Sequence, residues 1–176
     1  MKLNKLMLAT MIAFASASVA HAASNQGSGK VTFTGSIIDA PCSIEPNSVD
    51  QTVPMGQISS RILDKQGKSS MEPFSIKLKD CSLSTMKNVK VTFTGTPDPD
   101  NSKLLALSGT ATGAGIMIYD KLHSKDVELG TATDGQGLTE NDNSLDFAAY
   151  LQGSSASGAV VPGDFTSVAN FTLAYL

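Results

Sequence analysis

The sequence predicts an all-β fold, a sandwich of short strands. Apolar and polar residues alternate through several short segments, which directs their side chains to opposite faces of a strand. Clusters rich in Gly, Pro and Asp separate these segments, as turns separate strands. Helical periodicity is almost absent. About seven short strands punctuated in this way favour an all-β sandwich.

The first predicted strand covers residues 31–34 and is followed, after Gly35, by Ile37 and Ile38. Later segments with the same alternation are 74–79, 89–94, 145–151 and 171–175. Residues 31–35 and 91–95 spell the same five residues, Val-Thr-Phe-Thr-Gly. Two copies of a favourable strand sequence need no duplication event, so we predict no internal repeat.

The segment 116–119 is apolar on both faces, as a central strand would be. Turn-forming clusters lie at 96–101, 134–137 and 153–155. If the chain has a helix, we expect one short element near residues 58–65. The span 132–144 is predicted to be a polar loop.

Residues 1–22 have the three-part pattern of a secretory signal peptide. Lys2 and Lys5 precede an apolar stretch from Leu6 to about Ala15, and small residues follow up to Ala22. A membrane-spanning helix needs about 20 apolar residues, more than this stretch contains. We therefore expect cleavage after Ala22, which leaves 154 of the 176 residues in the exported chain.

Cys42 and Cys81 are the only cysteines. An exported chain meets an oxidising compartment, in which such a pair forms a disulfide. A redox-active pair would normally have C-x-x-C spacing, whereas 38 residues separate these two. The sequence therefore predicts a structural disulfide that closes a loop of about 40 residues and stabilises the fold by ~3–4 kcal/mol.

The two ends of the exported chain do not suit a closed sandwich. Residues 23–30 are small, polar and rich in glycine, and they run directly into the alternating segment 31–34. At the other end the alternation continues to Leu176. Edge strands are usually blunted by charges, proline or bulges. A detachable strand at one end and an uncapped apolar strand at the other suggest pairing between molecules.

Composition excludes several classes of function. The whole chain has 13 basic and 16 acidic side chains, a net charge of −3, without the Lys/Arg clusters that contact nucleic acid. Two Cys and two His are too few for a metal site built from clusters of these residues. We expect no nucleic-acid partner, no metal and no cofactor.

No set of catalytic residues can be assembled from the sequence. His123, the one imidazole left after cleavage, lies in a polar stretch that is typical of a solvated hairpin turn. The nearest match to a G-x-S-x-G motif places Ser157 where the second glycine is required. Asp98 and Asp100 alternate with prolines, which suits an exposed loop better than a glycosidase pair. We therefore predict a protein that is not an enzyme.

Several segments resemble the major subunits (pilins) of bacterial chaperone–usher fimbriae. The matching segments are Gly-Lys-Val-Thr-Phe-Thr-Gly at 29–35, Ile-Ile-Asp-Ala-Pro-Cys-Ser-Ile at 37–44, Gln-Thr-Val-Pro-Met-Gly-Gln-Ile at 51–58, Phe-Ala-Ala-Tyr-Leu at 147–151 and Val-Pro-Gly-Asp-Phe at 161–165. The resemblance covers essentially the whole exported chain. It is closest to P-pilus-like and mannose-resistant Proteus-like fimbriae.

The resemblance implies an incomplete immunoglobulin-like sandwich that lacks its last strand and is completed by donor-strand exchange. It implies a signal peptide at 1–22, an N-terminal donor-strand extension at 23–33 and a pilin domain at 34–176. The extension of one subunit would fill a groove beside the C-terminal strand of the next, and the subunits would polymerise head to tail.

Residue roles follow from the same resemblance and from the alternation. Gly27, Gly29, Val31 and Phe33 form one face of the expected donor strand. On the acceptor side we expect four residues in the groove or the strand that a chaperone binds: Gly163, Phe171, Leu173 and Tyr175. Gly163 and Tyr175 occupy the family's positions fourteenth from the C-terminus and penultimate. The family pattern departs at Leu176, where many relatives end in a polar residue.

The expected function is that of a structural subunit of a surface fimbria that supports cell adhesion. The expected partners are further copies of the chain, a periplasmic chaperone, an outer-membrane usher, and minor and tip subunits. The chain would pass through the periplasm to the cell surface. The alternative is a monomeric secreted β-sandwich that binds carbohydrate, but the loops carry Gly, Asp and Thr rather than sugar-stacking aromatics.

Overall fold

The computed structural model describes residues 27–155 and 157–176. The chain divides into two units, Met1–Ile37 and Ile38–Leu176. The expected signal peptide lies outside the described residues. Residues 27–37 form no helix or strand, and their side chains are exposed. The strand expected at 31–34 is therefore not formed within this single chain, and the described secondary structure begins at β1.

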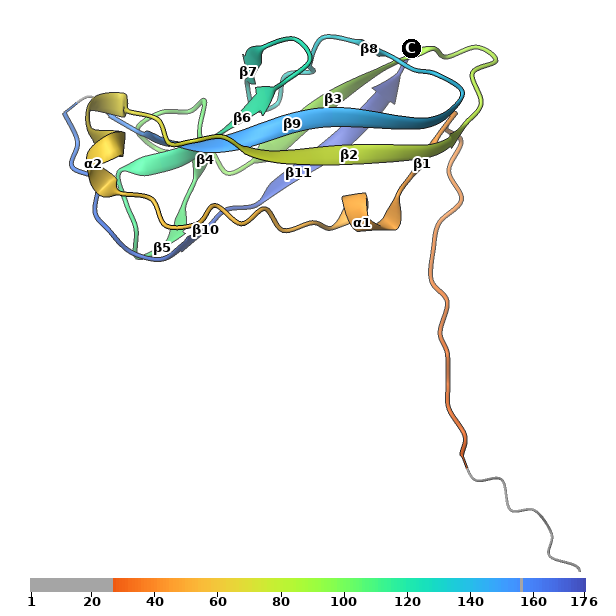
Figure 1. Cartoon of the computed structure of the whole chain (residues 1–176), viewed down its shortest axis with the longest axis horizontal. Helices are drawn as coiled ribbons and strands as arrows, with labels where there is room; N and C mark the ends of the chain where they lie inside the picture. The colour runs from red at the N-terminus through yellow and green to blue at the C-terminus, as the bar shows by residue number, and fades with distance from the viewer. Residues whose placement is uncertain (1–26, 156) are drawn as a thin grey trace, which may run out of the picture. The chain divides into compact units, whose positions relative to one another are not determined.

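The larger unit contains one main antiparallel sheet (Figure 1). Its strands lie in the order β1 (Ser43–Ile44), β2 (Glu72–Cys81), β9 (Asn141–Gly153), β6 (Ala114–Asp120) and β4 (Leu105–Ala106). A short strand, β7 (Lys125–Val127), also pairs with β6. The segment that we expected to be a central strand is part of β6, which lies between β9 and β4 and is almost entirely buried.

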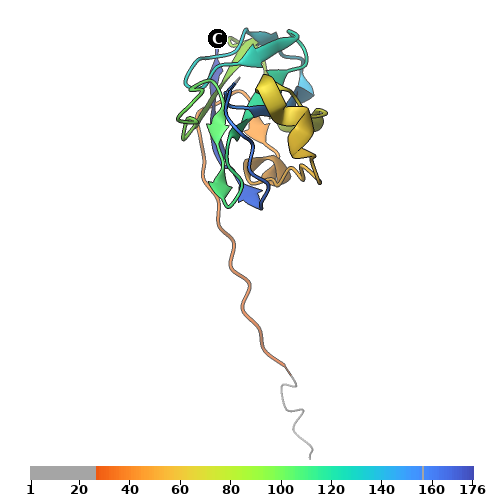
Figure 2. The same cartoon turned by 90° about the vertical axis from the view of Figure 1, so that its left-hand side faces the viewer.

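A second sheet has the order β11 (Ala169–Tyr175), β3 (Asn88–Gly95) and β8 (Gln136–Gly137). A third pairs β10 (Phe165–Thr166) with β5 (Ser108–Gly109). Three short helical elements complete the unit: α1 (Pro46–Val49), α2 (Ser60–Leu63) and the 3₁₀ helix η1 (Asp64–Gln66). Figure 2 views the unit from the end at which α2 lies.

The alternation in sequence is the reason that the two larger sheets pack together. One face of β3 buries Val89, Val91 and Phe93, and the facing residues of the main sheet belong to the same core cluster. Four phenylalanine rings meet in this core, with Phe93 5.0 Å from Phe147 between ring centroids. Such burial contributes roughly 25 cal/mol per Å² of apolar surface.

The structure corrects two expectations and confirms a third. The span 132–144, expected to be a loop, contains β8 and the start of β9; backbone pairing with β3 and β2 makes strands there despite the polar sequence. The helix α1 was not expected, although Pro46 at its first turn is a recognised start signal. The short helix expected near 58–65 is present as α2 with η1.

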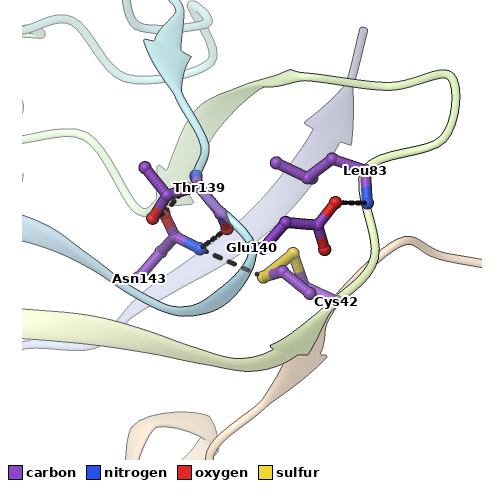
Figure 3. The surroundings of a disulfide bond; sticks show 6 residues. Cys42, Leu83, Thr139, Glu140 and Asn143 are labelled. Atoms are coloured by element: carbon purple, nitrogen blue, oxygen red, sulfur yellow. Dashed lines mark hydrogen bonds between the residues drawn. A yellow bond between two sulfur atoms is a disulfide. The ribbon is translucent and has the colours of Figure 1, made fainter.

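The predicted disulfide between Cys42 and Cys81 is present and both residues are buried (Figure 3). It joins the segment before β1 to the end of β2. Asn143 donates a hydrogen bond from Nδ2 to Cys81 Sγ at 3.3 Å and another to the Thr139 carbonyl at 2.7 Å. Glu140 accepts a hydrogen bond from the Leu83 amide at 3.2 Å. Hydrogen bonds thus link the bridge to β9, and the segment before β9 to the loop after β2.

Removing the disulfide should lower stability. Replacing both Cys42 and Cys81 by Ser reopens a loop of 39 residues, and we expect the free energy of unfolding to fall by ~3–4 kcal/mol. Urea denaturation of the full chain measures this, with Ser82→Ala as a control at an exposed neighbour. A change within about 0.5 kcal/mol, typical of surface substitutions, would contradict the expectation.

Candidate functional site: an apolar groove beside β11

The C-terminal strand β11 forms one edge of its sheet. It pairs antiparallel with β3 over seven residues, from Ala169 opposite Gly95 to Tyr175 opposite Val89. Among the described residues, no strand pairs with the other edge of β11. A row of backbone donors and acceptors is therefore left open along this edge.

The hydrogen bonds around β3 show which groups of β11 face the open edge. Leu176 and Asn88 exchange backbone hydrogen bonds at 2.9 and 3.0 Å, so the even-numbered residues of β11 bond to β3. Val91 and Phe93, in contrast, accept hydrogen bonds through their carbonyls from Thr133 and Gly130, on the far side of β3. In an antiparallel ladder this alternation directs the N–H and C=O groups of Phe171, Leu173 and Tyr175 to the open edge.

A groove of about 1100 Å³ borders the beginning of β11, where Ala169, Asn170 and Phe171 line it. One wall is the segment 48–58, which includes Met55 and Ile58, and the other is the segment 160–171. Core side chains of both sheets form its apolar floor: Phe74, Phe93, Leu105, Ile116, Ile118 and Leu151. The groove is thus an opening into the hydrophobic core rather than a surface hollow.

The second wall packs closely, at Gly163, against the backbone of Thr110 and Ala111. The carbonyl of Asp164 accepts hydrogen bonds from the amides of Thr110 and Ala111 at 2.9 and 3.2 Å, and its amide donates to Thr110 Oγ1 at 3.1 Å. A Cβ atom at Gly163 would lie 2.6 Å from the Ala111 amide nitrogen, closer than atoms in contact can be. Glycine therefore allows this wall to pack directly on the neighbouring backbone.

The side chains of β11 reach the core without being fully covered. Phe171, Leu173 and Tyr175 are half-buried and pack against the main core cluster. The Tyr175 hydroxyl is buried and has no hydrogen-bond partner among the described residues. Burial raises the pKa of the Tyr175 phenol, because the ionised form is poorly solvated there.

Three of the four predicted acceptor residues, Phe171, Leu173 and Tyr175, lie on β11, and Gly163 lies before β10. Gly163 and Phe171 line the groove, whereas the predicted donor residues belong to the other unit. Val31 and Phe33 are 75% and 90% exposed, and no atom lies within 4 Å of a Cβ built on Gly27 or Gly29. Among the described residues, no strand fills the groove, and the extension that carries the predicted donor residues forms no strand.

Two features of the site were missed by reading the sequence. The side chain of Ile37 is fully exposed and continues the alternation of Val31 and Phe33, with Gly35 between them. That periodicity was the signal that could have found Ile37. The wall at 48–58 begins at the end of α1 and is otherwise without helix or strand, and its position beside the groove follows from tertiary packing alone.

The described residues offer little for catalysis at this site. Across 27–155 and 157–176, no group of three or more His, Cys, Asp or Glu side chains is placed to hold a metal ion. His123 Nδ1 lies 2.7 Å from Asp120 Oδ2, and its amide donates to Asp120 Oδ1, an arrangement that caps the turn after β6. No helix in the described part of the chain is long and apolar enough to cross a membrane.

Comparison with known proteins identifies the family. A family model described as "Fimbrial protein" matches residues 31–176. The chain belongs to this family. It is 59% identical to the Fimbria A protein of Serratia marcescens over 175 residues, covering 99% of both chains. It is 46% identical to the Major MR/P fimbria protein of Proteus mirabilis over 176 residues, again covering 99% of both.

Solved structures of fimbrial proteins have the same fold. A structure of a chaperone–usher pilus, concerned with rod uncoiling, has a TM-score of 0.76 at 35% identity, covering 86% of this chain and 97% of that one. The P pilus rod subunit PapA has a TM-score of 0.70 at 31% identity, covering 78% and 100%. The fold of this fimbrial protein is therefore the incomplete immunoglobulin-like sandwich that the resemblance implied.

Two tyrosines provide a test of the groove, because the Tyr175 hydroxyl has no hydrogen-bond partner among the described residues and the Tyr150 hydroxyl has two. Tyr175→Phe removes a buried hydroxyl that lacks a partner, so we expect the free chain to gain about 1 kcal/mol of stability. Tyr150→Phe is the matched control. Its hydroxyl accepts from Lys68 Nζ and donates to Asp126 Oδ1, both at 2.7 Å, so its loss should cost ~1–3 kcal/mol. Equal destabilisation in urea would contradict this account of Tyr175.

The raised pKa of Tyr175 also predicts how the free energy of unfolding depends on pH. Because burial raises the pKa of Tyr175 in the folded state, the neutral phenol's contribution to stability is fully present below the ordinary tyrosine pKa of 10.0. That contribution is lost as the pH rises above this value. Tyr175→Phe should therefore lose less stability above pH 10 than the natural chain. Urea denaturation between pH 8 and about pH 11 measures the difference, and parallel curves would contradict the burial of the phenol.

Proposed function

We propose that this fimbrial protein is a structural subunit of a fimbrial rod, which polymerises head to tail by donor-strand exchange and supports cell adhesion. One observation carries the proposal: the same chain contains an unfilled apolar groove with an open strand edge and an exposed strand-like segment. Strand addition would join them, with backbone hydrogen bonds giving affinity and alternate side chains giving specificity.

The apolar residues of the extension supply the energy for this association. A buried aromatic side chain removes about 150–250 Å² from water, so at roughly 25 cal/mol per Å² Phe33 alone contributes a few kcal/mol. Val31 adds to this, and so does Ile37, which extends the donor segment beyond the expected end at residue 33. Gly27 and Gly29 would let the backbone pack closely against the acceptor.

A donor and an acceptor on one chain generate a filament. Each subunit would fill the groove of one neighbour and offer its own groove to another, a heterologous contact that does not close on itself. The similarity to a P pilus rod subunit at 31% identity supports a place in the rod rather than at its tip. Minor and tip subunits would then occupy the end of the same filament.

The open groove also suggests that other proteins assist the chain during its export. An unpaired strand edge over exposed core residues is prone to aggregate. We propose that a periplasmic chaperone lends a strand to β11, and that an outer-membrane usher exchanges it for the next subunit at the cell surface. The chain would act without catalysis, and the alternative of a monomeric carbohydrate-binding protein becomes an outcome of the following test.

A charge on the core-facing side of the extension should prevent assembly. Phe33→Asp would place a carboxylate in the apolar groove, at a cost of several kcal/mol. We expect cells that make this variant to carry at least tenfold fewer fimbriae by electron microscopy, with similar amounts of chain in extracts. Thr32→Asp, whose side chain points to the opposite face, is the matched control.

If Phe33→Asp forms filaments normally, the donor-strand proposal is wrong, and the alternative of a monomeric β-sandwich is favoured. Equal loss in both variants would indicate that charge anywhere in the extension interferes, and that the apolar face is not what binds.

The second wall of the groove offers an independent test. Gly163→Ala forces the backbone at 161–166 away from Thr110 and Ala111, because a methyl group has no room there. We expect weaker filaments that dissociate at lower temperature. Gly135→Ala is the matched control, because Gly135 also lacks positive φ and a Cβ there would meet no atom beyond its chain neighbours closer than 3.8 Å. If filaments of Gly163→Ala dissociate at an unchanged temperature, this wall is not part of the binding site.

A further inference from the structure

A second strand edge of the molecule lacks a strand partner over much of its length. β1 pairs with β2 only where Ser43 and Ile44 lie opposite Lys79 and Leu78. On this side of β2, residues 72–77 have no strand partner among the described residues, while β9 covers the other side. The chain turns instead into α1, which contacts β2 (Figure 1). A bare edge of this length would be a second place for strand addition.

The backbone groups on this edge belong to every second residue of β2. The Glu45 amide donates to the Lys77 carbonyl at 2.9 Å, so the backbone groups of Lys77 point away from β9. By the alternation of an antiparallel ladder, those of Ser75 and Pro73 point the same way. An added strand would have to pair with these three residues.

We propose that Ser48, Gln51 and Pro73 close this edge of β2 to strand addition and so direct an incoming strand to β11. The inference rests on the proposed function and adds to it the residues that decide which edge is used. They determine specificity because they leave too few free backbone groups on β2 for a strand to pair with.

Ser48 takes the place of a strand carbonyl. The residue is buried, and its Oγ accepts a hydrogen bond from the Lys77 amide at 3.0 Å. In a continued strand the Glu45 carbonyl would accept that bond. Here the Glu45 carbonyl accepts the Ser48 amide at 2.8 Å, where α1 begins. The turn of α1 therefore ends β1 and supplies the hydroxyl that occupies Lys77 in its place.

Gln51 and Pro73 block the next two positions of the edge. Gln51 Nε2 donates to the Ser75 carbonyl at 3.3 Å. Pro73 has no N–H group, and proline within sheets is confined to edges and bulges for this reason. Among the described residues, this leaves only the Ser75 amide and the Pro73 carbonyl to a new strand on this stretch.

Hydrogen bonding rather than packing closes the β2 edge. A hollow of about 330 Å³ lies between residues 45–54 and residues 73–77. Ser48 and residues 51–54 line both this hollow and the apolar groove, so a single segment separates the two places. Because there is space beside β2, the edge is closed by the occupation of its backbone groups.

The open edge of β11 has none of these devices. Residues 169–175 contain no proline. Within the described part of the chain, no side chain forms a hydrogen bond with the backbone of Phe171, Leu173 or Tyr175. The two edges therefore differ in chemistry, because the groups of β2 are occupied and those of β11 are available.

Opening the β2 edge should create a new contact between copies of the chain. The test variant combines Ser48→Ala, Gln51→Ala and Pro73→Ala in the full chain, with Phe33→Asp added to suppress donation to β11. Antiparallel pairing of two β2 edges about Ser75 places Lys77 of one copy opposite position 73 of the other. We expect the association constant in analytical ultracentrifugation to rise by about tenfold or more over that of Phe33→Asp alone, because each backbone hydrogen bond made available favours association.

Amide hydrogen exchange locates the new contact. The amides of Ser75 and Lys77 should exchange more slowly in the associated test variant than in the same variant diluted to monomer. A general loss of stability would make these amides exchange faster, so the readout separates a closed edge from a merely structural role of Ser48 and Gln51.

A matched control uses the same residue types on the neighbouring stretch of chain. Pro54→Ala, Gln57→Ala and Ser59→Ala, again with Phe33→Asp, replace exposed residues whose side chains form no hydrogen bond among the described residues. This control should remain as monomeric as Phe33→Asp alone. If the loss of buried Ser48 prevents folding, Gln51→Ala with Pro73→Ala retains Ser48 and should show a smaller rise in association with the same protected amides.

The inference and the proposed function can fail separately. A folded test variant that stays monomeric overturns the inference, as does association that protects amides of β11 alone, or equal association by the control. Normal fimbriae from Phe33→Asp would contradict donor-strand exchange instead, and the amides of Ser75 and Lys77 would still report whether the β2 edge had been opened.

Discussion

The open edge of β11 is the constraint on which the rest of the structure depends. Buried backbone groups need hydrogen-bond partners, and apolar side chains need cover from water. β3 satisfies one edge of β11, while the other edge borders a groove whose floor is the hydrophobic core. A sandwich of this kind is missing one strand, and the same missing strand would supply both the hydrogen bonds and the cover.

The surrounding structure keeps the groove open enough to receive a strand. The disulfide ties the segment before β1 to the end of β2 and so fixes where the wall at 48–58 begins. On the other side, the contacts of Asp164 with Thr110 and the absence of a side chain at Gly163 hold the second wall. Walls held in this way would leave the proposed strand-binding site largely pre-formed, which would reduce the entropy lost when a strand is added.

Stability outside the groove is concentrated in the main sheet. Its outer face carries a second small core of Leu104, Met117 and Tyr150. The Tyr150 hydroxyl bonds to Lys68 and Asp126, which come from different parts of the chain. Because the buried Tyr150 has partners for its hydroxyl, the main sheet can serve as a stable base while the groove remains incomplete.

Much of the fold and part of the site could be predicted from the sequence. Alternation located the strands that bury one face, such as β3, because the two-residue period is a local property. It failed for β8 and the start of β9, whose polar residues are strands only because β3 and β2 pair with them. It also failed at residues 31–34, where a favourable strand sequence has no strand partner among the residues that the structure describes.

The sequence by itself determined the all-β class, the Cys42–Cys81 bridge and the residues with apolar alternation at both ends. These depend on composition and on neighbours along the chain. Only the tertiary structure decided that β11 is an edge strand and that the segment 48–58 forms the opposite wall. It also decided that the buried Tyr175 hydroxyl has no partner within the described part of the chain. Those features arise from contacts between residues distant in sequence, which no local pattern encodes.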